Sequence, residues 1–294
     1  MTFTPETKEE YSAKIPALQV LCALGWEYIN PAECMEKRSS NREVILLDQL
    51  ISALKKRRFE WNGEKHALSP NAIEQIIREI RSPGLNEGLM TANERIYDKL
   101  TLGITITEFI DGKRVQPTIS ILDWDNPENN LFHVTEEFEV LNTSGVYSRI
   151  PDIVCFVNGI PMVVIEAKRP ESGNPNKSMV DEGISQNIRN QKNDEIPALF
   201  AYAQLLLSIS NTQGRYATTK TPAKFWSAWR EEELGEAVFK KVKNMPLKDA
   251  QKENIFKNRP YKMVKYFETL WSNEVLPTDQ DRLLISLLSK YLIM

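Results

Sequence analysis

Three charged residues interrupt the apolar stretch PDIVCFVNGIPMVVIEAK at residues 151–168. Asp152 precedes its first apolar run, and Glu166 and Lys168 stand at the end of the second. Two carboxylates can hold Mg²⁺, which prefers oxygen ligands and keeps several waters, and the carbonyl oxygen of Ala167 would be a third ligand. Lys168 lies two residues past Glu166, on the same face of a strand, where it would hold or help deprotonate a water. Such a set is suited to hydrolysing a phosphodiester, because a cation neutralises the charge that develops on the phosphate.

The acid-x-Lys spacing is not specific by itself. It also occurs at residues 6–8 and 111–113, where neither a rigid strand nor an acidic partner is predicted. Asp152, Glu166 and Lys168 differ because a charge in an apolar strand is costly unless it is paired or functional. Two structural alternatives remain open at this point: a buried ion pair between Asp152 and Lys168, or a strand that emerges into solvent at Glu166.

The register of the hairpin decides whether the two acids can share an ion. Asn158-Gly159, between the two runs, predicts a tight turn. An ideal two-residue turn would pair Asp152 with Ile165 and place Glu166 on the opposite face. The metal-site interpretation therefore requires a register one residue longer, from an odd-length loop or a β-bulge.

Hydrophobic periodicity predicts the elements that must position these residues. It favours helices over residues 8–24, 42–57, from Pro70 with Ser69 as the N-cap, 86–100 and 179–192. From residue 102 the period changes to two, and a strand pair with a turn at 111–112 leads into a sheet that continues through 131–140, the hairpin and a pair ending near 219. Both hairpin strands are almost wholly apolar, which predicts central strands covered on both faces. The fold class is therefore α/β, a central mixed β-sheet flanked by helices.

The chain of 294 residues changes character at residue 222. Beyond that point it is rich in Trp, Lys and Glu and shows helical but no strand periodicity, so we expect one domain over 1–222 and a helical segment over 223–294. The sequence ends on the apolar stretch LLISLLSKYLIM. Such an end indicates either a fragment whose partner segment is missing or a docked terminal helix.

Composition indicates a cytoplasmic protein with weak intrinsic affinity for nucleic acid. No apolar run is long enough to cross a membrane, and the start has no secretion signal. The cysteines and histidines show no zinc-ligand spacing, and buried reduced thiols are expected. The net charge is −3, although basic residues gather around the proposed site, where they form either a phosphate-binding surface or only a solvated face. These basic residues are Arg149, Lys168, Arg169, Lys177, Arg189 and Lys192.

The stretch PDIVCFVNGIPMVVIEAK resembles the PD-(D/E)xK nuclease superfamily, and the chain is most similar to the amino-terminal region of the R subunit of type I restriction-modification enzymes. LGWEYIN, ILDWDNPENNLF and IPALFAYAQLLLSISN agree with this resemblance, which covers most of residues 10–220. It implies a restriction-endonuclease-like fold and a type I site-specific deoxyribonuclease domain that cuts double-stranded DNA with Mg²⁺. The implied partners are methyltransferase and specificity subunits.

The resemblance also implies roles for single residues. Asp152, Glu166 and Lys168 match the catalytic residues of the family, and Gln186 matches the glutamine of its Gln-xxx-Tyr element. Asn190 stands where that tyrosine would be, so the role of this position is open and Gln186 could be an ordinary helix-surface residue. The family's ATP-driven motor carries a Gly-rich loop ending in Gly-Lys-Ser/Thr, which does not occur in these residues, so no ATP site is expected here.

Two other functions fit the same sequence. One is a catalytically silent, nuclease-like module that docks onto methyltransferase and specificity subunits. The other is a Mg²⁺-dependent nuclease of DNA repair, which would differ in its partners. A further acidic ligand from the helices is also conceivable, with Glu43 and Asp48 as unranked candidates.

Overall fold

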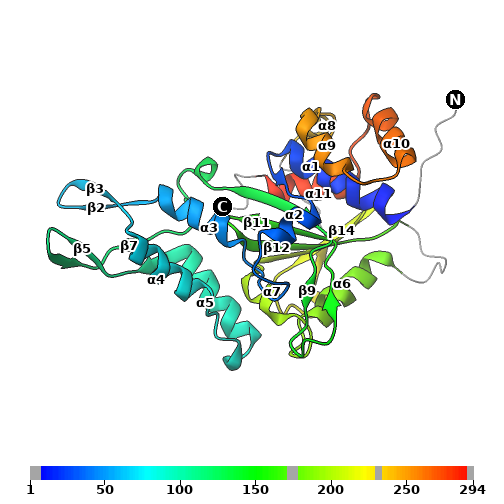
Figure 1. The fold of residues 1–294 in the computed structure, drawn as a ribbon. Coiled ribbons are helices and arrows are strands. Elements are labelled where there is room, and N and C mark those ends of the chain that lie inside the picture. Colours follow the sequence, from blue (N-terminus) through cyan, green and yellow to red (C-terminus); the bar gives the residue numbers. More distant parts are fainter. Residues whose placement is uncertain (1–7, 171–177, 229–233, 290–294) are drawn as a thin grey trace.

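The computed structural model describes residues 8–170, 178–228 and 234–289. Its centre is a seven-stranded mixed sheet in the order β1-β8-β11-β12-β13-β14-β15 (Figure 1). The strands are β1 (Glu27–Tyr28), β8 (Phe132–Glu136), β11 (Ile153–Val157), β12 (Ile160–Ala167), β13 (Leu205–Ser210), β14 (Gln213–Ala217) and β15 (Ser227–Ala228). β1 runs parallel to β8 and β12 parallel to β13, while the other pairs are antiparallel. The predicted α/β class is confirmed.

Helices cover both faces of this sheet (Figure 1). α6 (Met179–Asn190) and α7 (Pro197–Tyr202) pack on one face, and α1 (Ile15–Ala23) and α11 (Asp279–Leu288) lie on the other. Every residue of β11 and β12 is buried, so the prediction of central strands covered on both sides is confirmed. The cysteines are buried free thiols, as expected.

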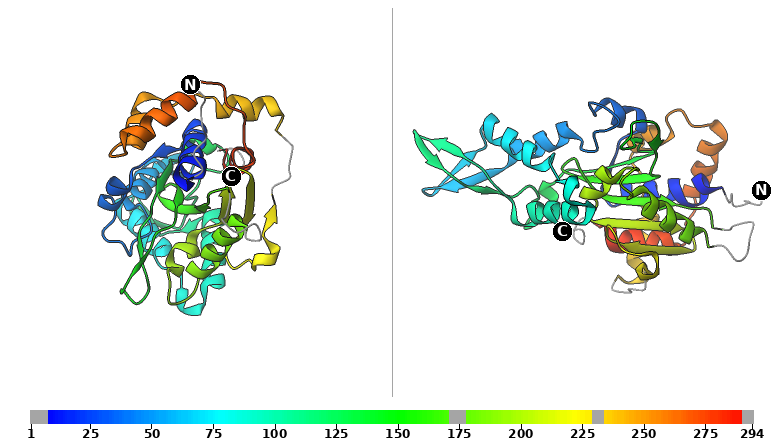
Figure 2. Two further views of the ribbon diagram at one scale, coloured as in Figure 1. Left: turned by 90° about the vertical axis from the view of Figure 1, so that its right-hand side faces the viewer. Right: turned by 90° about the horizontal axis from the view of Figure 1, so that it is seen from below.

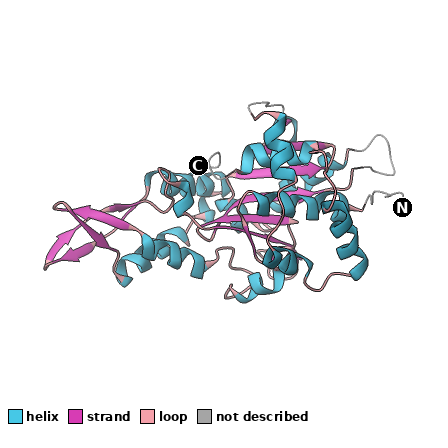
Figure 3. Ribbon diagram, turned by 90° about the horizontal axis from the view of Figure 1, so that it is seen from above, coloured by secondary structure: helices cyan, strands magenta, loops and turns pink. Residues whose placement is uncertain are grey.

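Residues between the first helices and β8 form an arm that extends away from the sheet (Figures 2 and 3). Its helices are α3 (Leu47–Lys56), α4 (Pro70–Ile80) and α5 (Leu89–Leu102), and its strands are β2 (Arg58–Trp61), β3 (Glu64–Ala67), β4 (Ile104–Thr105), β5 (Glu108–Ile110), β6 (Lys113–Val115) and β7 (Thr118–Ile119). The strands pair only among themselves. The prediction that the strands after residue 102 belong to the central sheet was therefore wrong, because β1 occupies the edge of β8 that they would have extended.

The helix starts show which local signals were sufficient. Ser69 caps α4 as predicted, and its hydroxyl accepts a hydrogen bond from the backbone N–H of Ala72 at 3.1 Å. The helix predicted from residue 42 begins only at Leu47. The backbone N–H of Leu46 instead donates to the carbonyl of Gly159 at 2.8 Å, which ties the start of α3 to the turn of the central hairpin. A Cβ on Gly159 would lie 2.2 Å from the carbonyl oxygen of Leu46, so this contact needs glycine.

The segment beyond residue 222 packs on the same hydrophobic core as the sheet. It adds β15, which the sequence did not predict, and the helices α8 (Glu236–Lys243), α9 (Asp249–Phe256), α10 (Tyr261–Trp271) and α11. α11 contacts α1 and β14, so the apolar end of the sequence is docked as far as Leu288; residues 290–294 lie outside the described part. No helix within the described ranges is both long and apolar enough to cross a membrane.

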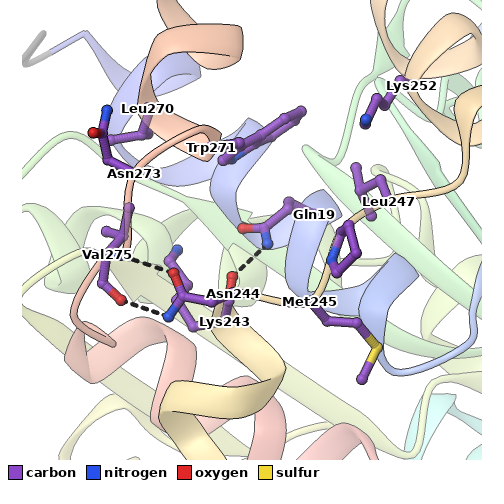
Figure 4. A pocket seen from close by; sticks show the side chains of 11 residues that line it. Gln19, Lys243, Asn244, Met245, Leu247, Lys252, Leu270, Trp271, Asn273 and Val275 are labelled. Atoms are coloured by element: carbon purple, nitrogen blue, oxygen red, sulfur yellow. Dashed lines mark hydrogen bonds between the residues drawn. The ribbon is translucent and has the colours of Figure 1, made fainter.

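A small cavity marks the contact between α1 and this segment. Gln19 of α1 donates to the carbonyl of Lys243 at 2.7 Å, and Asn244 bonds to the backbone of Val275 (Figure 4). The cavity between them measures about 90 Å³. The hydrogen bonds around it tie the end of α8 to the first helix and to the loop that precedes α11.

The remaining elements are short. They are a π-helical turn, η1 (Glu10–Lys14), the helix α2 (Pro31–Glu36), three 3₁₀ turns, η2 (Leu85–Glu87), η3 (Pro127–Asn129) and η4 (Ala223–Phe225), and the ladder of β9 (Val140–Leu141) with β10 (Ser148–Arg149). η1 continues directly into α1 and brings the first helix to the end of β12 where the charged residues lie.

Candidate active site

The register of the central hairpin places the two acids opposite each other. Cys155 pairs with Val163 but Phe156 pairs with Pro161, so β12 contains one extra residue at this point. A proline has no N–H to complete a ladder, which is why a bulge at Pro161 is favourable. Beyond the bulge Ile153 faces Ile165, and the next rung of this register sets Asp152 against Glu166. This is the register that a shared metal site requires.

Hydrogen bonds and ion pairs join the three predicted residues. Nζ of Lys168 lies 3.0 Å from Oδ2 of Asp152, 3.5 Å from Oε2 of Glu166 and 3.0 Å from the carbonyl oxygen of Ala167. The backbone N–H of Ala167 donates to Oδ2 of Asp152 at 2.9 Å. Asp152 is 9% exposed, and Glu166 and Lys168 are each 4% exposed. The strand does not emerge into solvent at Glu166, so that alternative is wrong, and the ion pair exists together with a second carboxylate.

The burial of this cluster changes its acid-base properties. Burial raises the pKa of Glu166 well above its ordinary range, and the negative charge of Asp152 raises it further, while Lys168 only partly offsets both. Burial alone would lower the pKa of Lys168, but the neighbouring carboxylates outweigh burial and raise it. Lys168 is therefore held as a cation, and Glu166 is a carboxyl group whose charge this environment does not fully compensate.

The first helix contributes two residues that sequence analysis did not assign to the site. Oε2 of Glu9, just before η1, lies 3.9 Å from Nζ of Lys168, and Nζ of Lys14 lies 3.8 Å from Oδ1 of Asp152. Burial, followed by the effect of Asp152, raises the pKa of Glu9, although Lys168 acts in the opposite direction. Lys14 also pairs with Glu137, at the end of β8. Three carboxylates thus approach Lys168.

Glu43 and Asp48, the two candidates for a further acidic ligand, lie away from the site. Glu43 pairs with Arg81, next to α4, and accepts a hydrogen bond from the backbone of Ile45. Asp48 lies on α3, at the end of the hairpin that is remote from Glu166. No sequence signal separates Glu9 from Glu10, because both lie on the polar side of one helical pattern. Only the packing of η1 against the end of β12 distinguishes them.

The six predicted basic residues lie in different environments. Arg149 makes two hydrogen bonds of 2.6 Å to the carboxylate of Glu195, and Arg189 bonds to the side chain of Asn190. Lys168 is buried among carboxylates, while Lys177 lies outside the described residues. Carboxylates thus match the charges of Arg149 and Lys168, whereas Arg169 and Lys192 are exposed, so a phosphate-binding surface stays a prediction.

Comparison with known proteins identifies the family of this chain. The family model described as "Type I restriction enzyme R protein N terminus" matches residues 6–225. The chain belongs to this family. The putative type I restriction enzyme MjaIXP endonuclease subunit of Methanocaldococcus jannaschii is 27% identical over 235 residues, which are 78% of this chain and 21% of that protein. The type I restriction enzyme HindI endonuclease subunit of Haemophilus influenzae is 27% identical over 218 residues, 72% of this chain and 19% of that protein.

A second subunit of M. jannaschii, the putative type I restriction enzyme MjaVIIIP endonuclease subunit, is 29% identical over 248 residues, 79% of this chain and 21% of that protein. The chain spans about a fifth of the length of these relatives. The match to the R-protein family ends at residue 225, so α8 to α11 lie beyond it.

Helix α6 bears Gln186, the glutamine that the resemblance to the R-protein family implies, but Asn190 stands in place of the tyrosine. Gly183 packs so closely on the sheet that a Cβ there would lie 2.3 Å from the hydroxyl of Ser208 and 3.2 Å from Cβ of Glu166. Gln186 follows three residues later and is half-buried, but no hydrogen bond between described residues joins it to the acids. Asn190, in place of the tyrosine, is buried and accepts from Arg189. α6 therefore lies directly over Glu166, and the role of Gln186 stays a prediction.

The donor atoms fit a hard divalent cation. Within the described ranges, no group of three or more His, Cys, Asp and Glu side chains is arranged to hold a metal ion. Asp152, Glu166 and the carbonyl of Ala167 nevertheless supply oxygen ligands, which suits Mg²⁺ because it keeps several waters and needs only one or two carboxylates. Burial and Asp152 raise the pKa of Glu166, so its ionised form is not fully compensated, and a bound cation would stabilise that form. The residues present thus fit the ion that the resemblance implies.

Proposed function

We propose that this chain is the endonuclease portion of a type I restriction enzyme R protein and hydrolyses phosphodiester bonds of double-stranded DNA with Mg²⁺. The observation that carries the proposal is the bulge in the central hairpin, because it places Asp152 and Glu166 on one face beside Lys168. A purely structural ion pair needs one acid, whereas this site buries two. Membership of the R-protein family supports the same conclusion.

Each residue has a definite role in this proposal. Asp152, Glu166 and the carbonyl of Ala167 would hold the cation, which when bound would neutralise charge at the scissile phosphate. Lys168 stays protonated, orients the attacking water by donating to it and stabilises the negative charge that develops on the phosphate. Its ammonium lies 3.0 Å from Asp152 and 3.5 Å from Glu166, next to the oxygen atoms that would hold the cation. Gln186, on the helix above Glu166, would contact the phosphate or the water.

The partners follow from the family and from the charge of the chain. We propose that it acts in the cytoplasm with methyltransferase and specificity subunits, which hold the DNA. Residues 1–222 would form the nuclease domain, and residues 223–294 would lead toward the motor region of an R protein. A net charge of −3 gives little non-specific affinity, so we expect DNA binding by this chain alone to be weak and to be lost as salt increases.

The alternative is a catalytically silent docking module. Its support is the ion pair between Asp152 and Lys168, which could be purely structural. Retention of Glu166 argues against it, since a silent module has no use for a second buried acid with a raised pKa.

A plasmid-cleavage assay tests the proposal. The purified chain, incubated with supercoiled plasmid and Mg²⁺, should produce nicked DNA slowly, and addition of EDTA should stop the reaction. Asp152→Asn and Glu166→Gln should remove the activity, and ATP should not be hydrolysed. Equal nicking by the native chain and both variants would favour the docking module. Co-purification with DNA-repair proteins instead of a methyltransferase would indicate a repair nuclease.

A further inference from the structure

We propose that Arg259, outside the part of the chain that matches the R-protein family, is a positioning residue for the nuclease site. Arg259 would position the site by fixing the start of the first helix, which carries Glu9 and Lys14. The inference rests on the proposed nuclease function and extends it beyond residue 225, where the match to the family model ends.

Arg259 joins three parts of the fold. It follows α9, where its Nε donates to the carbonyl of Ile255 at 2.7 Å. Its guanidinium forms one ion pair with Glu10 of η1 and a second with Glu136 of β8. The side chain is only 11% exposed. A planar guanidinium can bridge two carboxylates at once, which a lysine ammonium cannot do with the same geometry.

Each of these two carboxylates stands next to a residue of the site. Glu10 directly follows Glu9, whose carboxylate faces Lys168. Glu136 directly precedes Glu137, whose backbone N–H donates to the carbonyl oxygen of Asp152 at 3.0 Å and whose side chain pairs with Lys14. Arg259 therefore fixes both elements, η1 and the end of β8, whose separation determines where Lys14 and Glu9 meet the acids.

The buried carboxylate of Glu136 explains why a cation such as Arg259 is needed between η1 and β8. Glu136 is 4% exposed, and besides Arg259 it accepts a hydrogen bond from the hydroxyl of Tyr28 at 2.5 Å. A cavity of about 470 Å³ lies beside this contact and is bounded by Glu9, Lys14, Glu137 and Arg259 among others. Without Arg259, Glu10 would lose its ion pair, and Glu136 would keep only the hydroxyl of Tyr28 and the electrostatic attraction of Lys14. Repulsion would then move η1 away from the site.

Hydrogen bonds other than those of Arg259 fix the position of α9, so the backbone that carries Arg259 is held in place. Nδ2 of Asn254 donates to the carbonyl of Tyr28 at 2.9 Å, and its Oδ1 accepts from Asn30 at 3.0 Å. These bonds attach α9 to the edge strand β1, which pairs with β8. A displacement of the helices beyond residue 225 would therefore reach the site through Arg259.

The experiment compares Arg259→Met with Arg282→Met. Arg282 lies in the same helical segment and pairs with Glu236, but it makes no contact with the site in the described structure, so it is a matched control. In plasmid cleavage by the full chain, Arg259→Met should lower kcat by about 10- to 100-fold, the range for residues that orient ligands, with KM for DNA little changed. Arg259→Lys should recover part of the loss, and Arg282→Met should match the native chain.

A double variant and hydrogen exchange identify the route. Lys14→Met should itself lower kcat, and adding Arg259→Met should lower it no further, because both changes break one chain of contacts. Backbone amides of residues 9–14 should exchange faster in Arg259→Met but not in Arg282→Met. A native kcat in Arg259→Met, or losses that simply multiply in the double variant, would overturn the inference.

The exchange measurement also separates this inference from the proposed function. If the native chain shows no Mg²⁺-dependent cleavage, the proposed function fails, and the amides of residues 9–14 then decide alone whether Arg259 positions the first helix. If Arg259→Met does not fold, Arg259→Lys provides the same comparison with a smaller expected change. Unchanged exchange in a folded Arg259 variant would overturn the positioning role regardless of activity.

Discussion

Two clusters of buried charge in this chain differ in one respect. In the helical segment, Lys243 donates to Oδ1 of Asp281 at 2.9 Å, while the backbone N–H and the hydroxyl of Thr278 both donate to Oδ2 at 2.8 Å. One cation meets one acid, and both carboxylate oxygens are satisfied. At the end of the central hairpin, Lys168 instead meets Asp152 and Glu166.

This difference supports the proposal that the hairpin cluster binds a cation, whereas the pair of Lys243 and Asp281 is structural. Asp281 is fully buried and matched by its partners, so it needs nothing more. Glu166 is almost as deeply buried, but its raised pKa shows that its charged form is not matched. Surplus buried negative charge is unfavourable for folding and favourable for binding a cation, whereas a matched pair is only structural.

The largest expected effect separates the clusters by activity. Glu166→Gln should lower the rate of Mg²⁺-dependent plasmid cleavage by about 1000-fold or more, because a cation at the phosphate supplies several kcal/mol. Asp281→Asn, assayed at a temperature at which it is folded, should cleave at the native rate. Equal losses in both variants would mean that the two clusters do not differ in function.

Stability should show the opposite order. Asp281→Asn should lower the free energy of unfolding by about 3–5 kcal/mol, because it leaves Lys243 buried without its acid. Urea unfolding at neutral pH measures this loss. Replacing both partners with apolar residues of similar volume should recover most of it. A loss below about 1 kcal/mol, as for an exposed ion pair, would contradict the assignment of a buried structural pair.

Added Mg²⁺ should stabilise only the chain with both acids. At a concentration 100 times its Kd, the ion should raise the free energy of unfolding by about 2.7 kcal/mol. Glu166→Gln should show little or no shift, and Asp281→Asn should show the native shift from its lower starting point. Thermal unfolding with and without EDTA measures the effect. A Mg²⁺ shift retained in Glu166→Gln would place the ion elsewhere.

The smallest effect concerns pH in metal-free buffer. The pKa of Glu166 is higher in the folded chain than its ordinary value of 4.5, chiefly through burial, so folding favours the protonated form. Its contribution to stability is present below that value and is lost as pH rises through the folded pKa. Glu166→Gln should remove this part of the slope, while Asp281→Asn should keep it. Urea unfolding at a series of pH values in EDTA measures the slope. The same slope in Glu166→Gln as in the native chain would contradict the prediction.

The sequence by itself determined the strongly periodic elements and the identity of the charged residues. The cap at Ser69 placed the start of α4, and the paired apolar runs placed the central hairpin with its acids and lysine. Local hydrogen bonds and side-chain periodicity are sufficient for such elements. Two-residue strands such as β1 and β15 were not predictable, because two residues are too few to show a hydrophobic periodicity.

Only the tertiary structure decided which charged residues share one site. A period of two defines the faces of a strand but not its register, and the bulge beside Pro161 determined that Asp152 faces Glu166. Glu9 and Arg259 are separated from the hairpin by more than a hundred and by about ninety residues respectively. No sequence motif identifies Glu9 or Arg259 as part of the site, because ion pairing across such separations depends on how the packed elements contact one another. The chain specifies these contacts only through the core that brings η1, β8 and α9 together.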